Sequence, residues 1–492
     1  MLRITAGSSP PIPGHQERSP IRIPGAAQVA AFMTTCVGLA GALWTIREPH
    51  YGDAMGYYVP YAHSVFEHPT RLVAESLPTL GHPPLQAVLI AAVWSLTGVN
   101  TWVPHAAVLG AAVAALTLSW RFVRAEAGPW MATLSTALIL SIPVFQSQAR
   151  VATPEMMVTA WTMASLVALR GHRWSAAGVA LGAATMSKET AIVLLPLVVL
   201  WAIVVDKPHG SPVDLRRAAS ITARVAGPPT LLLMAWIAYH LAMTGGFLDG
   251  SANPSDEPMT LMYAMERAAA RTVEVTLRAA LGPLLMVGVG SAAVLLLRRR
   301  LPANVVLASL PLLTYLPMVS LFGHSLARYL LPALPPMVCA CVVASHKHRG
   351  WLLVAASGTV VLAAAQMWSA PPHNVDPEGS LAYRNVLHRD IAVVRQVERI
   401  TRANHRPFVA LTSTYSDGFP YTHQLGRPYV GYVDRSIAHE VRLDDVGCDA
   451  DAVINGGGRT PRRMELRNPE VFRPAGDGWS RRYEVIVGEP GC

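Results

Sequence analysis

Charge is what this sequence has least of. Only 14% of its 492 residues are charged, whereas 52% are hydrophobic, and the mean hydropathy is +0.33. Soluble domains carry about 25% charged residues. The shortage of charge therefore excludes an ordinary soluble protein and predicts a polytopic membrane protein.

Lysine and cysteine are also scarce. The only lysines are Lys188, Lys207 and Lys347, so nearly all the positive charge is arginine. Three of the five cysteines lie in apolar runs, where cysteine is usually a small hydrophobic residue. The other two, Cys448 and Cys492, lie in the polar tail, where an oxidising compartment would permit a disulfide; the alternative is two unpaired thiols.

The positive charge is not gathered in one patch. The formal net charge is +9, and the basic residues lie in short loops between apolar runs. This is the pattern of cytoplasmic loops in membrane proteins, so it indicates no nucleic-acid partner. No internal repeat of fixed period is evident either.

Eleven apolar segments have the length, or nearly the length, of a membrane span. They are Ala26–Ile46, Val103–Val123, Trp130–Ala149, Met156–Leu169, Ala176–Met186, Ala191–Val205, Val225–Met243, Ala279–Leu297, Ala303–Phe322, Leu330–Ser345 and Trp351–Met367. A twelfth, Pro84–Val99, is short and opens with two prolines. If this segment does not cross the membrane, every arginine-dense short loop lies on the cytoplasmic side. If it does cross, those loops lie outside, whereas basic loops of membrane proteins are normally cytoplasmic.

We therefore expect an all-α membrane protein with about eleven transmembrane helices and Pro84–Val99 re-entrant or interfacial. Residues 1–24 are expected to be a cytoplasmic tail before an uncleaved anchor, and residues 25–368 the transmembrane catalytic domain. Residues 369–492 are expected to form a small α/β domain outside the cell or in the periplasm. In it, Asn385–Asn404 has a helical rhythm, and Phe408–Leu411, Tyr429–Val433, Ala452–Ile454 and Tyr483–Val487 resemble short strands.

The outer loop from Glu48 to Leu85 is the first candidate for a functional site. Asp53 lies just after the first apolar segment and is followed by interfacial aromatic residues such as Tyr57 and Tyr61. An ionisable group beside the bilayer is a functional candidate, and near a low-dielectric boundary its carboxylate can serve as a general base. The alternative is that Asp53 caps the helix that contains the tyrosines.

Further candidates lie in the other outer loops. Glu155 starts the fourth apolar segment, just after Arg150, and is either a site acid or an acid that suits a helix N-terminus. Lys188 and Arg328, followed by Tyr329, are cations at headgroup depth that suit a lipid phosphate, with anchoring to lipid headgroups as the alternative. His82 and His324 could bind phosphate, but they lack the spacing of metal ligands. No cofactor is indicated, and the question of a divalent metal stays open.

Five motifs in order resemble a known family. They are GDAMGYYVPYA, GHPPL, ARVATPE, MSKETAIVLLP and ARYLLPALP, spread over about the first 345 residues. They resemble the dolichyl-phosphate-mannose-protein mannosyltransferase-like superfamily, with its bacterial aminoarabinose transferases. The resemblance implies the GT-C glycosyltransferase fold, a run after HPPL that lies beside the membrane, and an acid in the first outer loop that deprotonates or positions the acceptor. The chain departs from the pattern with Gly-Asp-Ala where relatives have Asp-Glu, and with Glu155 where they usually have Asp.

The resemblance implies an integral glycosyltransferase of the inner (plasma) membrane. It would move a sugar from a polyprenyl-phosphate donor to a protein, lipid or glycan acceptor, with Asp53 and Glu155 as catalytic residues. Lys188, Arg328, Tyr329, His82, Arg150 and Tyr57 would bind substrate. A transporter or flippase of a lipid-linked or anionic substrate is the alternative, but its charges would lie near the midplane, within inverted repeats. A polysaccharide polymerase or ligase is a third option.

Overall fold

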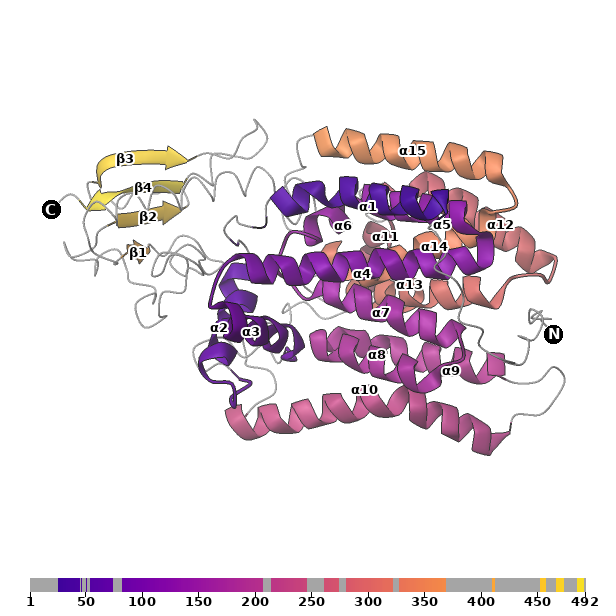
Figure 1. Ribbon diagram of the computed structural model, residues 1–492, viewed down its shortest axis with the longest axis horizontal. Coiled ribbons are helices and arrows are strands. Elements are labelled where there is room, and N and C mark those ends of the chain that lie inside the picture. The colour runs from indigo at the N-terminus through magenta and orange to yellow at the C-terminus, as the bar shows by residue number, and fades with distance from the viewer. Residues whose placement is uncertain are drawn as a thin grey trace.

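The computed structural model describes a helical bundle and one small sheet (Figure 1). The described residues are 25–44, 46, 50, 54–73, 82–206, 214–245, 261–273, 280–321, 327–368, 409–411, 452–456, 466–472 and 485–490.

The helices follow one another through most of the chain. In order they are α1 (Ala26–Trp44), the π-helical turn η1 (Ala54–Tyr58), α2 (Val59–Glu67), α3 (Leu85–Thr97), α4 (Trp102–Ala127), α5 (Pro129–Ser141), α6 (Pro143–Gln148), α7 (Glu155–Arg170), α8 (Trp174–Ser187), the 3₁₀ segment η2 (Glu189–Leu194), α9 (Leu195–Asp206), α10 (Leu215–Thr244), α11 (Leu261–Val273), α12 (Gly282–Leu297), α13 (Ala303–Leu321), the 3₁₀ segment η4 (Ala327–Ala333), α14 (Leu334–Ser345) and α15 (Arg349–Trp368).

Each of the eleven predicted apolar segments overlaps a helix. Within the described residues, six helical stretches are long and apolar enough to cross a membrane, and four shorter apolar helices accompany them. The six are Ala26–Leu43, Trp102–Ala127, Glu189–Asp206, Leu215–Thr244, Ala303–Ser320 and Arg328–Ser345. A multi-helix membrane protein is thus confirmed, whereas the count of eleven crossings and the sidedness of the termini stay predictions.

The ambiguous segment forms α3, a helix of 13 residues. At about 1.5 Å per residue it is roughly 20 Å long, which is shorter than the roughly 30 Å hydrocarbon core. It packs mainly against α2, and Figure 1 shows the two helices together at one end of the bundle. Trp94 is fully buried, and its indole N–H donates to the carbonyl of Asn100 over 3.0 Å. Because α5 has the same length and α8 is one residue longer, the length of α3 does not decide whether this segment crosses, and that stays a prediction.

The core of the bundle lies around α14. All of its residues are buried, and it packs against α12, α13, α4 and α5. Its neighbour α12 comes very close, because a Cβ atom on Gly288 would overlap the side chain of Cys341. A small residue lets two helix backbones approach in this way.

Two prolines shape the contact between α8 and α10. Pro228 and Pro229 lie inside α10 and lack the N–H groups that would bind the carbonyls of Arg224 and Val225, four residues earlier. Both carbonyl oxygens lie against Gly178 of α8, where a Cβ atom would overlap the Arg224 oxygen and lie 3.0 Å from the Val225 oxygen. Gly178 therefore allows α8 to cover the backbone that the prolines leave open.

The sheet has the strand order β1-β2-β4-β3, with β1 (Val409–Leu411) parallel to β2 (Ala452–Gly456) and the other pairs antiparallel. Strands β1, β2 and β4 (Val485–Pro490) overlap three predicted strands. The prediction missed β3 (Leu466–Phe472) because Asn468-Pro469 resembles a turn. The structure places this proline on an edge strand, where the pairing register shifts between Arg467 and Glu470, and a sheet tolerates proline there.

The other calls on the tail lie outside the described residues. These are the helix Asn385–Asn404, the strand Tyr429–Val433 and both cysteines of the tail. Figure 1 shows the sheet beyond the end of the bundle at which α2 and α3 lie. The domain boundary after residue 368 and the compartment of the tail stay predictions.

Candidate functional site

Three charged side chains from separate elements meet inside the bundle, and we call them the buried charge cluster. Glu155 Oε1 lies 2.6 Å from Lys188 Nζ and 3.6 Å from Arg328 Nε. The side chains of Glu155, Lys188 and Arg328 are only 1%, 6% and 1% exposed. The structure thus brings together three residues that lie in three separate motifs of the sequence.

The cluster holds two cations and one carboxylate, so its formal charge is +1. Burying charges is costly unless they are paired, and the carboxylate of Glu189, the next residue in the chain, also interacts with Lys188. The ring of Tyr329 lies over both cations: Lys188 Nζ lies 3.9 Å from the ring centroid and Arg328 Cζ 5.5 Å from it. Glu155 Oε2 is buried and has no hydrogen-bond partner within the described residues. The cluster can therefore accept an anion and can still accept a hydrogen bond.

Interruptions of regular helix place these side chains. Glu155 is the first residue of α7, after Pro154, and suits the positive end of the helix dipole. Lys188 has an extended backbone (φ −158°, ψ 129°) between α8 and η2, so the chain turns away from the α8 axis at this residue. Arg328 and Tyr329 lie in the 3₁₀ segment η4.

A second pair lies directly beside the cluster. Nδ1 of the His82 imidazole lies 3.0 Å from Oε2 of Glu189, the residue that follows Lys188 in the chain. These two side chains are 18% and 30% exposed. Tyr57 meets the His82 ring edge-on at 5.7 Å and Tyr58 lies stacked at 6.0 Å. The His82–Glu189 pair is thus held by aromatic rings and is more accessible than the cluster.

The aromatic residues of the outer loop are fixed in position. The hydroxyl of Tyr61 donates to the carbonyl of Leu72 over 2.5 Å, and the Leu72 N–H donates to the hydroxyl of Tyr239 in α10 over 3.0 Å. Burial raises the pKa of Tyr57 above its usual range, and the charge of Glu189 adds to this. Burial also raises the pKa of Tyr61. Both phenols therefore stay neutral hydrogen-bond donors at physiological pH.

Arg150 lies apart from the cluster. Its guanidinium packs against α1 where Gly41 leaves room, because a Cβ atom at Gly41 would overlap it. Its backbone carbonyl accepts a hydrogen bond from His105 Nδ1 over 2.7 Å, and the ring of His50 stacks on His105 at 4.2 Å. Burial lowers the pKa of His50 well below its usual value, and the neighbouring His105 adds to this. This arrangement favours a role for Arg150 in attaching α1.

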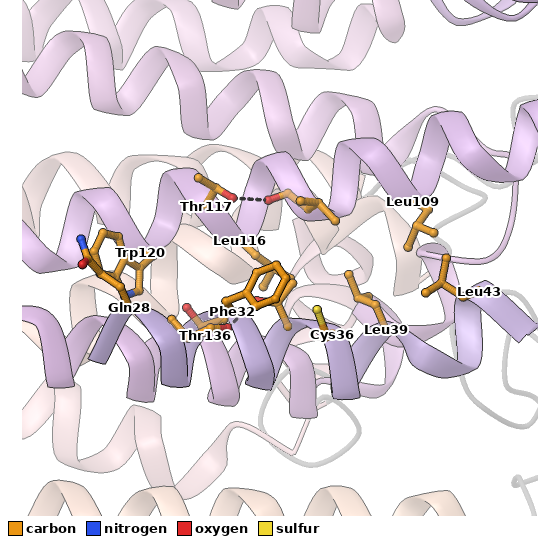
Figure 2. Close-up of a pocket in the computed structure, with 13 residues that line it drawn as sticks. Gln28, Phe32, Cys36, Leu39, Leu43, Leu109, Leu116, Thr117, Trp120 and Thr136 are labelled. Atoms are coloured by element: carbon orange, nitrogen blue, oxygen red, sulfur yellow. Dashed lines mark hydrogen bonds between the residues drawn. The ribbon is translucent and has the colours of Figure 1, made fainter. Parts of the chain in front are cut away.

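A separate apolar groove of about 330 Å³ lies between α1, α4 and α5 (Figure 2). Its walls include Phe32, Leu39, Leu116 and Trp120. The hydroxyl of Thr117 donates to the carbonyl of Val113 in its own helix over 2.8 Å, so it adds little polarity to the groove. None of the residues of the buried charge cluster lines this groove.

The predicted site residues thus divide into three groups. Glu155, Lys188, Arg328 and Tyr329 meet in or over the buried charge cluster, while His82 and Tyr57 lie beside it. Arg150 packs against α1, and its role in binding substrate stays a prediction. Asp53 and His324 lie outside the described residues. Within the part of the chain that the structure describes, no group of three histidine, cysteine, aspartate or glutamate residues could hold a metal ion.

Sequence reasoning missed two residues of this region, Glu189 and Tyr58. In the sequence, Glu189 is only an acid next to Lys188. Its partner His82 lies 107 positions earlier in the chain, so the sequence gives no sign of their contact.

The comparisons with known proteins agree with this fold. The profile of the family described as dolichyl-phosphate-mannose-protein mannosyltransferase matches residues 81–215. That stretch contains Glu155, Lys188 and the His82–Glu189 pair. No curated protein sequence matches the chain.

Solved structures with a similar fold are glycosyltransferases. ArnT from Cupriavidus metallidurans bound to undecaprenyl phosphate aligns with a TM-score of 0.58 and 14% identity over 94% of this chain and 97% of ArnT. The apo form of the same ArnT aligns with a TM-score of 0.54 and 17% identity over 78% of this chain and 72% of ArnT. The oligosaccharyltransferase of Archaeoglobus fulgidus in the apo form aligns with a TM-score of 0.51 and 10% identity over 88% of this chain and 69% of that enzyme. The chain has the fold of the GT-C glycosyltransferases, and the resemblance read from the motifs is confirmed.

Proposed function

We propose that this protein is an integral membrane glycosyltransferase that moves a sugar from a polyprenyl-phosphate donor to an acceptor hydroxyl at the outer membrane face. The observation that carries the proposal is the buried charge cluster, because two cations held side by side inside a GT-C fold suit a lipid phosphate. ArnT, which has a similar fold, was solved with undecaprenyl phosphate bound.

The cluster would hold the leaving group. Lys188 and Arg328 bind the donor phosphate, and the planar fork of arginine suits two phosphate oxygens at once. When the bond from the anomeric carbon to the phosphate oxygen breaks, negative charge develops on the phosphate, and preformed cations stabilise it. Both cations lie against the ring of Tyr329, so the donor phosphate would meet them beside this ring.

Glu155 has two tasks in this scheme. Its Oε1 positions Lys188 and Arg328. Its Oε2, which has no partner among the described residues, accepts a hydrogen bond from a sugar hydroxyl. Glu155 thereby orients the donor sugar beside the phosphate.

The acceptor would enter from the side of the His82–Glu189 pair. Asp53 belongs to the same outer loop as Tyr57 and aligns the acceptor hydroxyl for direct displacement at the anomeric carbon. The tail beyond residue 368 shapes the access of the acceptor, and membrane lipids surround the bundle. Because the leaving group is a lipid phosphate, this reaction needs no nucleotide-binding loop.

The test measures release of undecaprenyl phosphate in native membranes that contain the overproduced protein and its natural acceptors. The probes are undecaprenyl-phosphate-linked mannose and aminoarabinose, the sugars that the resemblance names. We expect release with at least one donor, and we expect Asp53→Asn to abolish it, since the substitution keeps the size but removes the charge that aligns the acceptor hydroxyl. Glu67→Gln, an exposed change on α2, is the matched control. Movement of the donor across the membrane without release would instead support a transporter and overturn the proposal.

A further inference from the structure

The His82–Glu189 pair has the arrangement of a general base with its orienting carboxylate. Glu189 Oε2 engages His82 Nδ1 over 3.0 Å. This contact fixes the ring, so Nε2 lies on the side of the imidazole away from the carboxylate. No hydrogen bond engages Nε2 within the described residues, and the side chain is partly exposed. The imidazole is therefore both oriented and reachable.

The buried charge cluster suits this task less well. Two cations stabilise the ionised form of Glu155, so its oxygens accept hydrogen bonds more readily than they take up a proton. Its side chain is also almost fully buried. The pair and the cluster are adjacent, because Lys188 and Glu189 are consecutive. An acceptor hydroxyl next to His82 would thus lie close to a sugar whose phosphate is held by Lys188.

We propose that His82 is the catalytic base that takes the proton of the acceptor hydroxyl, and that Glu189 is its positioning residue. This inference rests on the proposed function. It leaves Asp53 the task of aligning the acceptor.

The step balances without any further reactant. The acceptor O–H bond breaks and its proton passes to His82 Nε2, while the acceptor oxygen forms the new bond to the anomeric carbon. The bond between that carbon and the phosphate oxygen breaks, and its electron pair leaves with the lipid phosphate. The imidazolium that results is stabilised by the carboxylate of Glu189.

Within the described residues, the groups that face His82 are one carboxylate and two phenols. They are the carboxylate of Glu189, with Lys188 beyond it, and the phenols of Tyr57 and Tyr58. Tyr57 stays neutral because burial and Glu189 raise its pKa. The carboxylate that orients the ring is therefore also the described charged group in direct contact with it.

The experiment compares His82→Ala, His82→Gln and Glu189→Gln with the native protein in the same membranes, with affinity for undecaprenyl phosphate as a second readout. We expect His82→Ala to slow transfer by about 10²-fold or more, to leave lipid phosphate affinity unchanged, and to be rescued in part by added imidazole. The native rate should fall as the pH drops, because only an unprotonated base can take the proton of the acceptor. His82→Gln keeps the hydrogen bond to Glu189 and should lose this pH dependence. Glu189→Gln should retain more activity than His82→Ala.

Matched controls come from the same outer loop. His68→Ala and Glu67→Gln change an exposed imidazole and an exposed carboxylate on or beside α2, and both should keep the native rate and pH profile. Native turnover or an unchanged pH profile in His82→Gln, or no rescue of His82→Ala by imidazole, would overturn the assignment of His82 alone. A native protein that neither binds undecaprenyl phosphate nor releases it would overturn the proposed function and this inference with it.

Discussion

The two ends of α7 carry similar groups in different surroundings. At its first residue, Glu155 is shared by Lys188 and Arg328 in almost complete burial. At its last residue, Arg170 donates to Glu126 over 2.9 Å, and Asn304 donates to the same oxygen over 2.8 Å. The second cluster is partly open, since Arg170 and Glu126 are 26% and 22% exposed.

The difference lies in charge balance and in solvation. The open cluster at Arg170 is neutral, and it ties α4, α7 and α13 together with groups that water still reaches. The buried charge cluster gathers two cations around one carboxylate, with Glu189 beside Lys188, where desolvation is costly. Two cations held close together suit an anionic ligand, whereas the open end has a single cation and ties helices together.

The largest expected effect is on stability at the buried end. Glu155→Gln keeps the shape of the side chain but removes the buried carboxylate that Lys188 and Arg328 share. Breaking a buried pair in this way costs about 3–5 kcal/mol. We expect a clear drop in the thermal unfolding midpoint of the detergent-solubilised protein, and recovery of part of it when undecaprenyl phosphate is added. A midpoint equal to that of the native protein would remove the basis of the comparison.

The next effect concerns the affinity for the lipid phosphate. Charge-assisted hydrogen bonds contribute about 1.5–3 kcal/mol each, so Lys188→Ala and Arg328→Ala should weaken binding of undecaprenyl phosphate by roughly 10- to 100-fold. Arg328→Lys should also bind more weakly if the contact uses both arms of the guanidinium. Arg173→Ala removes an exposed arginine after α7 and is the control. Unchanged affinity in both alanine variants would leave only a structural role for these cations.

A smaller effect is expected at the open end. Glu126→Gln removes the carboxylate that Arg170 and Asn304 share, but partly exposed ion pairs contribute about 1 kcal/mol or less. We expect a small shift of the unfolding midpoint and no change in affinity for undecaprenyl phosphate. A loss as large as that of Glu155→Gln would show that burial does not distinguish the two ends.

The smallest effect is a dependence of stability on pH. Because burial lowers the pKa of His50 in the folded protein, the unfolded chain binds the proton more readily. The contribution of His50 is fully present above about pH 6.5 and is lost as the pH falls below that value. The unfolding midpoint should therefore drop between pH 7.5 and pH 5, and His50→Gln should drop less. Equal slopes in both proteins would contradict this.

The sequence predicted the helices well because hydropathy and length determine them locally. The segment Pro84–Val99 was harder, and the side on which the arginines lie predicts that it does not cross. The prediction missed strand β3 because Asn468-Pro469 is typical of a turn. The proline is tolerated because β3 lies at the edge of the sheet.

The site could be predicted only in part. Lys188 and Arg328 stood out as cations at the ends of apolar segments, but apolar segments do not specify which helix ends meet. The shared contact with Glu155 and the contact between His82 and Glu189 are products of tertiary packing. Arg150 packs against α1, where Gly41 leaves room for it, and its role in binding substrate stays a prediction.

The lengths of the helices that carry the site have a consequence for the surrounding lipid. Helix α4 has 26 residues, but α7 has 16 and α8 only 14, which corresponds to about 39, 24 and 21 Å. A hydrocarbon core of roughly 30 Å is thicker than the two short helices. Such hydrophobic mismatch is relieved when the bilayer thins locally. Thinning beside α7 and α8 would lower the headgroup level toward Lys188, so we expect the enzyme to work faster in bilayers of short acyl chains than in thick ones.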